Sequence, residues 1–142
     1  MFGEEKGLAD VANDEIIKAI PFAASIGIEL TLITPEQVVG RLSWSQDRTT
    51  AGGAIHGGAT MALADTIAAI CAVVNLPPGA TTTTTASSTV FVRAARSGTI
   101  IATARPIHVG RSTIVLVIEV RDDVDKLIAQ TTQTQAILAS SE

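Results

Sequence analysis

Residues 52–65 read Gly-Gly-Ala-Ile-His-Gly-Gly-Ala-Thr-Met-Ala-Leu-Ala-Asp, and the interpretation of the whole chain starts from this stretch. It opens with glycines on both sides of His56 and continues as an alanine-rich apolar segment. Alanine, leucine and methionine favour helix, and nothing breaks the segment before residues 76–79, Leu-Pro-Pro-Gly. We therefore predict a long apolar helix from Gly57 or Gly58 to about Asn75.

Asp65 lies in the middle of this helix and is the only formally charged residue between Thr49 and Val92. A carboxylate in so apolar a helix is costly unless it is paired, hydrated or used in chemistry. Two interpretations follow: a helix charge that faces water, or a functional carboxylate. The second is the working hypothesis.

The composition indicates a single self-associating domain. The chain has 142 residues, 46% of them hydrophobic, with a mean hydropathy of +0.39. We predict one domain, residues 1–142, in which residues 1–25 form a helical lead, and we expect apolar surface to be buried against a second copy.

Other classes of protein are disfavoured by the same totals. A net charge of −4 argues against general nucleic-acid binding. A membrane span through residues 59–76 would carry Asp65, so none is expected. The acidic N-terminus lacks the pattern of a signal peptide, which predicts a cytoplasmic protein. The lone Cys71 excludes an internal disulfide and a cysteine-built metal site, and its spacing predicts a small core residue.

The rest of the chain reads as short helices and strands. Asp10 or Asn13 can cap a short helix that Pro21 ends, with a further turn at residues 22–26. Alternating patterns predict a hairpin of strands 28–33 and 38–44. After the long helix we predict four more strands, which are residues 81–92, 99–109, 112–121 and 126–138. Pro106 implies an edge position or a bulge, and residues 130–135 form a polar centre in the last strand. The expected fold class is α+β: a single antiparallel sheet wrapped around one long central helix.

The Gly-x-x-His-Gly-Gly motif at residues 53–58, with Asp65 seven positions after its second glycine, resembles that of the hotdog-fold acyl-CoA thioesterases of the phenylacetic-acid-degradation type. The resemblance extends over about residues 22–138. It implies a hotdog domain that hydrolyses an acyl-CoA thioester. It implies no cofactor, since coenzyme A enters as part of the substrate.

Gly57 and Asp65 cannot act together within one chain. Eight residues of helix place them roughly 12 Å apart, so they cannot both reach one thioester carbonyl. Two antiparallel helices packed across a two-fold axis could bring one helix start near the middle of the other. The family arrangement is of this kind, which predicts a homodimer or a dimer of dimers. The resemblance assigns the Gly57 amide to the oxyanion and Asp65 to general-base or nucleophilic catalysis, and the two mechanisms stay open.

The resemblance extends to further site residues. His56 could polarise the thioester or fix the loop by hydrogen bonds. Thr50 stands where related enzymes often carry Asn or Gln, and Thr84 lies near the position of a water-holding Ser or Thr. An acidic position after it is replaced by Ala86.

The remaining expected contacts concern substrate binding. The resemblance places the phosphate contacts of coenzyme A at Arg93 and at the turn that contains Gly110, Arg111 and Ser112, because arginine pairs with phosphate bidentately. The alternative is that these are solvated arginines at strand ends. Gly58 and Met61 are expected to contact the substrate, and Met61, Ala68 and Ala69 to line an apolar pocket for an aryl or medium-chain acyl group.

Two alternatives remain for this sequence. One is a hotdog enoyl-CoA hydratase or dehydratase, although the loop and dyad of those groups are absent. The other is a non-catalytic acyl-CoA-binding hotdog protein. Release of free thiol from acyl-CoA separates the thioesterase from both, and hydration of an enoyl-CoA separates the other two.

Overall fold

The computed structural model describes residues 8–139, with side chains from Ala12 onward. The first residues of the expected helical lead therefore lie outside the described part. Helix α1 (Leu8–Lys18) is followed by α2 (Pro21–Ile26), which ends at Gly27 in the left-handed conformation, φ 84°. The predicted cap at Asp10 or Asn13 is wrong, because the strong helix formers Leu8 and Ala9 already belong to α1.

All six strands form one antiparallel sheet, as predicted. They are β1 (Glu29–Ile33), β2 (Val38–Ser43), β3 (Thr81–Phe91), β4 (Thr99–Val109), β5 (Thr113–Asp122) and β6 (Leu127–Leu138). Their order across the sheet is β1-β2-β4-β5-β6-β3. A short 3-10 helix, η1 (Gln46–Arg48), lies in the loop between β2 and the long helix.

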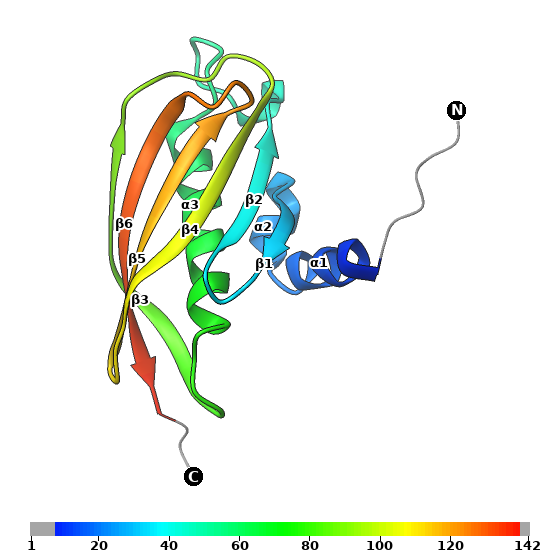
Figure 1. Ribbon diagram of the computed structural model, residues 1–142. Coiled ribbons are helices and arrows are strands. Elements are labelled where there is room, and N and C mark those ends of the chain that lie inside the picture. Colours follow the sequence, from blue (N-terminus) through cyan, green and yellow to red (C-terminus); the bar gives the residue numbers. More distant parts are fainter. Residues whose placement is uncertain (1–7, 140–142) are drawn as a thin grey trace.

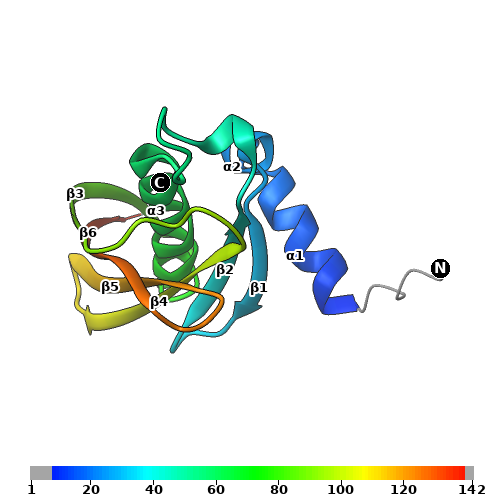
Figure 2. The same ribbon diagram turned by 90° about the horizontal axis from the view of Figure 1, so that it is seen from above.

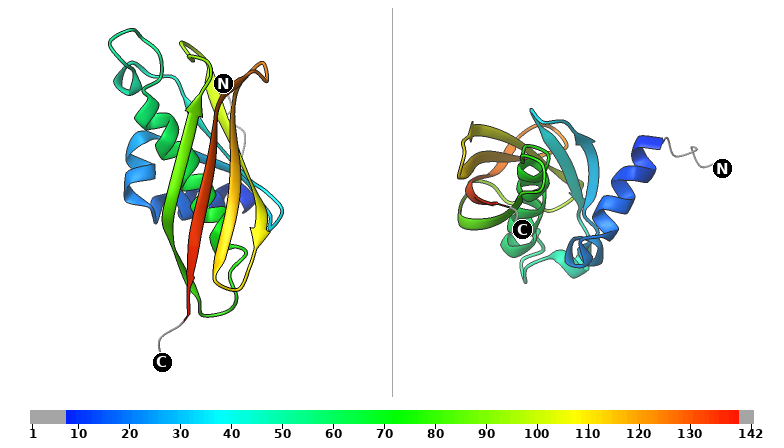
Figure 3. Two further views of the ribbon diagram at one scale, coloured as in Figure 1. Left: turned by 90° about the vertical axis from the view of Figure 1, so that its left-hand side faces the viewer. Right: turned by 90° about the horizontal axis from the view of Figure 1, so that it is seen from below.

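The long helix α3 (Gly57–Val73) lies in the concave face of the curled sheet, as Figures 1 and 2 show. Figure 3 shows the same arrangement from the side and from below. Leu63, Ile67, Ala68 and Cys71 on α3 are fully buried in the core. The hotdog architecture is therefore confirmed, and Cys71 is the core residue that its spacing predicts.

The alternating patterns of two strands place their side chains as expected. Ile114, Leu116, Ile118 and Val120 of β5 are all fully buried beneath α3. In β2 the inward residues include Val38, Gly40 and Leu42.

Bulges interrupt the regular alternation of side chains in two other strands, β1 and β4. The alternating sequence of β1 would place Leu30 and Leu32 on the same face, but a bulge between them shifts the alternation and leaves Leu32 exposed. A bulge follows Pro106 in β4, as its missing N–H predicts. The pairing of β4 with β2 ends at Ala104, before Pro106. The missing N–H of Pro106 therefore costs no hydrogen bond with β2.

The two edges of the sheet differ. Helix α1 packs against β1, whereas β3 pairs on one side with β6 and has no strand on its other side in the described residues. The left view of Figure 3 shows β3 in green at this edge, beside α3. Val90, Phe91 and Val92 are exposed at its end. A free edge with apolar side chains is unusual unless a partner covers it.

None of the helices among residues 8–139 has the length and apolar character that a membrane crossing requires.

Candidate active site

His56 caps the N-terminus of α3. Its Nδ1 accepts a hydrogen bond of 2.8 Å from the Gly58 amide. An accepting Nδ1 carries no proton, so the neutral ring carries its proton on Nε2. The ring is exposed, which leaves this Nε2–H free to donate. Of the two roles predicted for His56, loop fixing is therefore visible in the structure, while contact with a thioester stays a prediction.

The Gly57 amide is unused at the helix start. It is the first helical residue, and within residues 8–139 no acceptor lies within hydrogen-bond distance of its N–H. Such free amides point along the helix axis and bind anionic oxygen atoms. The ring of Phe91, at the end of β3, lies so close that a Cβ on residue 57 would approach its Cζ to 3.3 Å. The lack of a side chain at Gly57 therefore leaves a narrow approach to the amide beside an apolar ring.

Asp65 lies on the one stripe of α3 that the sheet does not cover. We call this the exposed stripe of α3, and its residues are Gly58, Met61, Ala62, Asp65, Ala69 and Val73. Asp65 is thus exposed in the single chain, in an otherwise apolar stripe in which Met61 is 42% and Val73 55% exposed. Ala68 is fully buried against the sheet, so its expected place in the lining of a substrate pocket is wrong. Its place in the helix turn directs it into the core instead.

Gln133 of β6 holds the Asp65 carboxylate, and sequence reasoning missed it. Its Nε2 donates to Oδ1 of Asp65 at 2.8 Å, whereas Oδ2 accepts no hydrogen bond within the described residues. Gln133 in turn accepts from Gln135 Nε2 at 2.6 Å. Polar residues at every second position, Thr131, Gln133 and Gln135, are all buried in a strand whose inner face meets α3. This alternation of polar residues in the centre of β6 is the sequence signal from which Gln133 could have been identified.

A bulge in β3 determines which hydroxyls face this network. The register of β3 shifts between Thr84 and Ala86. Thr84 accepts from Gln135 Nε2 at 2.7 Å, and beyond the bulge Ser87 lies 3.5 Å from Gln133 Nε2. Ser87 is thus the β3 hydroxyl nearest to the Asp65–Gln133 pair, while Thr84 lies one glutamine further away. Ala86 is exposed.

The loop before α3 is held by its own backbone and by Thr50. The Thr50 amide donates to the Ala54 carbonyl at 2.8 Å, and its Oγ1 accepts from the Gly52 amide at 3.2 Å. Trp44 Nε1 donates to the Gly53 carbonyl at 2.9 Å. The Thr50 hydroxyl therefore stabilises the turn, and thioester binding by it stays a prediction.

Arg93 and Arg111 lie at opposite ends of the sheet. Arg93 follows Phe91, which pairs with Ala129 at the start of β6, whereas Arg111 lies in the β4–β5 turn near the end of β6. The intervening strand makes their separation roughly 30 Å. Gly110 and Ser112 share the turn of Arg111, and their backbones pair with Thr113 and Ile137. One chain therefore cannot apply both arginines to one coenzyme A.

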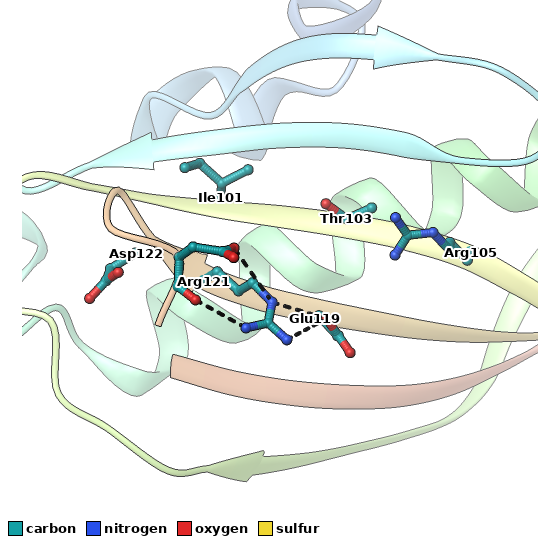
Figure 4. Close-up of a pocket in the computed structure, with 7 residues that line it drawn as sticks. Ile101, Thr103, Arg105, Glu119, Arg121 and Asp122 are labelled. Atoms are coloured by element: carbon teal, nitrogen blue, oxygen red, sulfur yellow. Dashed lines mark hydrogen bonds and ion pairs between the residues drawn. The ribbon is translucent and has the colours of Figure 1, made fainter. Parts of the chain in front are cut away.

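These two arginines are nevertheless distinctive. Every other arginine in residues 8–139 donates to a protein acceptor, but no partner lies near Arg93 or Arg111. Figure 4 shows the contrast at Arg121, in a pocket on the outer face of the sheet. Its guanidinium is engaged by Glu119 at 2.9 Å and by Asp125. This pocket lies on the opposite side of the sheet from α3 and Asp65.

A second pocket, of about 370 Å³, opens beside the start of α3. It lies between α2, η1 and the helix start, and Phe22, Ile26 and Ala59 form its apolar part. His56 and Gly58 also line this pocket, so the capped helix start borders it.

Comparisons with known proteins identify the family of this chain. The family model described as the thioesterase superfamily matches residues 52–129, more than half of the chain. ComA2 of Bacillus subtilis, named as an esterase, is 32% identical over 116 residues, which cover 80% of this chain and 91% of that protein. The 1,4-dihydroxy-2-naphthoyl-CoA hydrolase of Listeria monocytogenes is 28% identical over 113 residues, with coverage of 80% and 92%.

Two solved structures show the same fold. The thioesterase HI1161 of Haemophilus influenzae superposes with a TM-score of 0.86 at 23% identity, covering 100% of this chain and 98% of that one. The PaaI protein of Escherichia coli gives a TM-score of 0.81 at 22% identity, with coverage of 93% and 95%. The motif, the fold and these relatives together show that the chain belongs to the hotdog-fold thioesterase superfamily and is a thioester hydrolase.

Proposed function

We propose that this protein is an acyl-CoA thioesterase that acts as a homodimer or a dimer of dimers. The observation that carries the proposal is the position of Asp65. It is a solitary carboxylate in the apolar exposed stripe of α3. One oxygen is anchored by Gln133, and no hydrogen bond within the described residues engages the other. A carboxylate with one free oxygen can take a proton from water or attack an acyl carbon.

The reaction needs an oxyanion donor as well, and we assign it to the Gly57 amide of the partner subunit. Asp65 and Gly57 of one chain are roughly 12 Å apart along α3, too far to share a carbonyl group. Two copies paired along the free edge of β3 would place their α3 helices antiparallel, and the apolar exposed stripes support such a contact. The same pairing would bring the Arg93 end of one sheet beside the Arg111 end of the other.

In this site the thioester oxygen would accept from the Gly57 amide while Asp65 acts on the other face of the carbonyl. If Asp65 is a general base, it takes a proton from water as the water oxygen attacks the acyl carbon. If it is a nucleophile, it forms an anhydride that water then hydrolyses. Either route breaks the carbon–sulfur bond and releases coenzyme A as the thiol and the acyl group as a carboxylate. No cofactor enters this scheme.

The acyl group is proposed to be apolar, aryl or medium-chain. The apolar part of the pocket beside the start of α3, formed by Phe22, Ile26 and Ala59, supports this, as does the naphthoyl-CoA in the name of the Listeria relative. Such a coenzyme A substrate fits the cytoplasmic location that the sequence predicts.

The test is thiol release from a panel of aryl- and medium-chain acyl-CoAs by the wild type and by Asp65→Asn. Asparagine keeps the shape and can still accept from Gln133, but it can neither take a proton nor attack. We expect kcat to fall by at least about 10²-fold. The melting temperature should change little, because asparagine keeps the shape of Asp65 and its hydrogen bond from Gln133. Asp123→Asn, in the turn after β5, is the matched control and should keep full activity.

Three results would contradict the proposal. An Asp65→Asn variant that keeps more than a tenth of the wild-type kcat would make Asp65 structural. A wild type that binds acyl-CoA without releasing thiol would be a binding protein. A wild type that instead adds water to an enoyl-CoA would be a hydratase.

A further inference from the structure

The buried polar side chains of β6 and β3 form a hydrogen-bond chain with one direction, and this chain ends at Asp65. Thr82 Oγ1 donates to Gln135 Oε1 at 3.0 Å, or alternatively to the Ala136 carbonyl. Gln135 Nε2 donates to Gln133 Oε1 at 2.6 Å and to Thr84 Oγ1 at 2.7 Å. Gln133 Nε2 then donates to the carboxylate of Asp65 at 2.8 Å. Each amide thus donates toward the carboxylate.

The carboxylate dictates this direction. An ionised carboxylate accepts hydrogen bonds and cannot donate. Rotating the Gln133 amide by half a turn would place its oxygen against the Asp65 oxygen. It would also set its NH2 group against the donating NH2 group of Gln135. The orientation of one amide therefore determines that of the next, and the chain has a single low-energy arrangement.

This arrangement is unusual for its place in the core. Gln133 and Gln135 are fully buried, whereas the inner face of the adjacent strand β5 consists of Ile114, Leu116, Ile118 and Val120. Apolar side chains would fill the same space with a smaller loss of side-chain entropy and without the desolvation of two amides. No buried side-chain nitrogen or oxygen in the described residues lacks a partner, so the network is fully satisfied. A satisfied polar network in a core makes the geometry unique more than it adds stability.

We infer that Gln133 is a positioning residue that holds the catalytic carboxylate of Asp65, with Gln135 fixing the orientation of the Gln133 amide. The inference rests on the proposed thioesterase function and adds a residue to it. By engaging Oδ1, Gln133 fixes the rotation of the carboxylate and leaves Oδ2 for the reacting water or acyl carbon. Small errors in the placement of a reacting group cost large factors in rate, so this hydrogen bond should act on kcat.

The experiment compares Gln133→Leu with Thr131→Val. Both residues are fully buried on the same face of β6. Gln133→Leu loses the hydrogen bonds to Asp65 and from Gln135, and Thr131→Val loses the 2.7 Å contact with Thr89. Only Gln133 touches Asp65. We expect Gln133→Leu to lower kcat for acyl-CoA by about tenfold or more, because the reacting carboxylate is no longer held in place. KM should stay within about twofold, because the groups that bind the substrate are unchanged. Thr131→Val should lose thermal stability and keep its kcat.

A Gln133→Leu variant that keeps more than half of the wild-type kcat would overturn the inference, as would an equal loss in Thr131→Val. An inactive wild type would instead overturn the proposed function.

A second measurement decides the matter if Gln133→Leu does not fold. The side-chain amide signals of Gln133 in the 15N–1H spectrum report its hydrogen bonds without any substrate. Asp65→Ala removes the acceptor, so we expect these signals to shift and their protons to exchange faster with water. The signals of Gln130, which is exposed on the same strand, serve as the internal control and should stay in place. Unchanged Gln133 signals would show that the amide does not hold Asp65.

Discussion

Ile67 of α3 sits directly on Gly40 of β2. A Cβ added to Gly40 would overlap Cδ1 of Ile67 and lie 2.9 Å from its Cγ1. The missing side chain in the middle of the strand is what lets the helix approach the sheet so closely.

This contact predicts a coupled pair of substitutions. Gly40→Ala should lower the free energy of unfolding by about 1–3 kcal/mol, because the added methyl group must lift the helix or displace Ile67. Ile67→Val alone should cost about 0.5–1.5 kcal/mol. The double variant removes Cδ1, the atom that overlaps most with the added Cβ, so its loss should be smaller than the sum, as measured by denaturant unfolding of all four proteins. Strict additivity would show that the helix does not rest on Gly40.

A second prediction concerns the shared site. Asp65→Asn should leave both sites of a dimer without the carboxylate, and Gly57→Val should block both amides beside Phe91. In a randomly mixed population, half of the dimers are hybrids, and each hybrid has one intact site of its two. Mixing the two inactive variants after unfolding and refolding should therefore restore about a quarter of the wild-type activity.

The control for this mixing experiment is each variant refolded alone, which should stay inactive. No recovery in hybrids, with the oligomer shown intact by sedimentation, would place both groups in one chain. An active, folded monomer at micromolar concentration would refute the dimer itself.

A third prediction concerns coenzyme A binding. Arg93→Ala or Arg111→Ala should raise KM for acyl-CoA and leave kcat nearly unchanged, the result of lost uniform binding. Acyl-pantetheine thioesters lack the nucleotide phosphates, so their KM should not respond. Arg105→Ala is the matched control, since that guanidinium donates to Gln37 at 3.1 Å and is not available to a phosphate. Equal effects on both kinds of substrate would exclude a role in phosphate binding.

A fourth prediction concerns Cys71. Burial raises the pKa of its thiol from 9.0 to about 11, opposed by a weaker backbone contact at Val38. Folding thus favours the neutral thiol, so this contribution to stability is complete below pH 9.0 and is lost as the pH rises toward 11. We expect a loss of roughly 1 kcal/mol by pH 10.

The measurement for Cys71 is urea unfolding between pH 8 and pH 10, beside Cys71→Ala. The chain contains no tyrosine, which removes one other group that titrates there. The alanine variant should be less stable at every pH but show a flatter dependence. Native Cys71 should also resist thiol reagents until the protein unfolds, and rapid modification of the folded protein would contradict its burial.

The sequence by itself determined the elements and the centre of the site. The period of β5, the apolar run of α3 and the turn residues are local signals, so the helix and the sheet class followed from them. Asp65 was recognisable as a candidate because a lone charge in an apolar helix is a feature of the local sequence and does not depend on any distant residue. The His-Gly-Gly motif likewise placed the helix start, since capping depends on neighbours a few positions away.

Tertiary structure alone decided what surrounds that carboxylate. Gln133 meets Asp65 from 68 positions away, and only the pairing of β6 with β3 and β5 brings it there. The bulge after Thr84 turns Ser87 toward the glutamines of β6, because one inserted residue reverses which side chains of β3 point inward. Arg93 and Arg111 share an expected role in phosphate binding, but they lie at opposite ends of the sheet. The direction of the strands places them there, and no local sequence pattern encodes that direction.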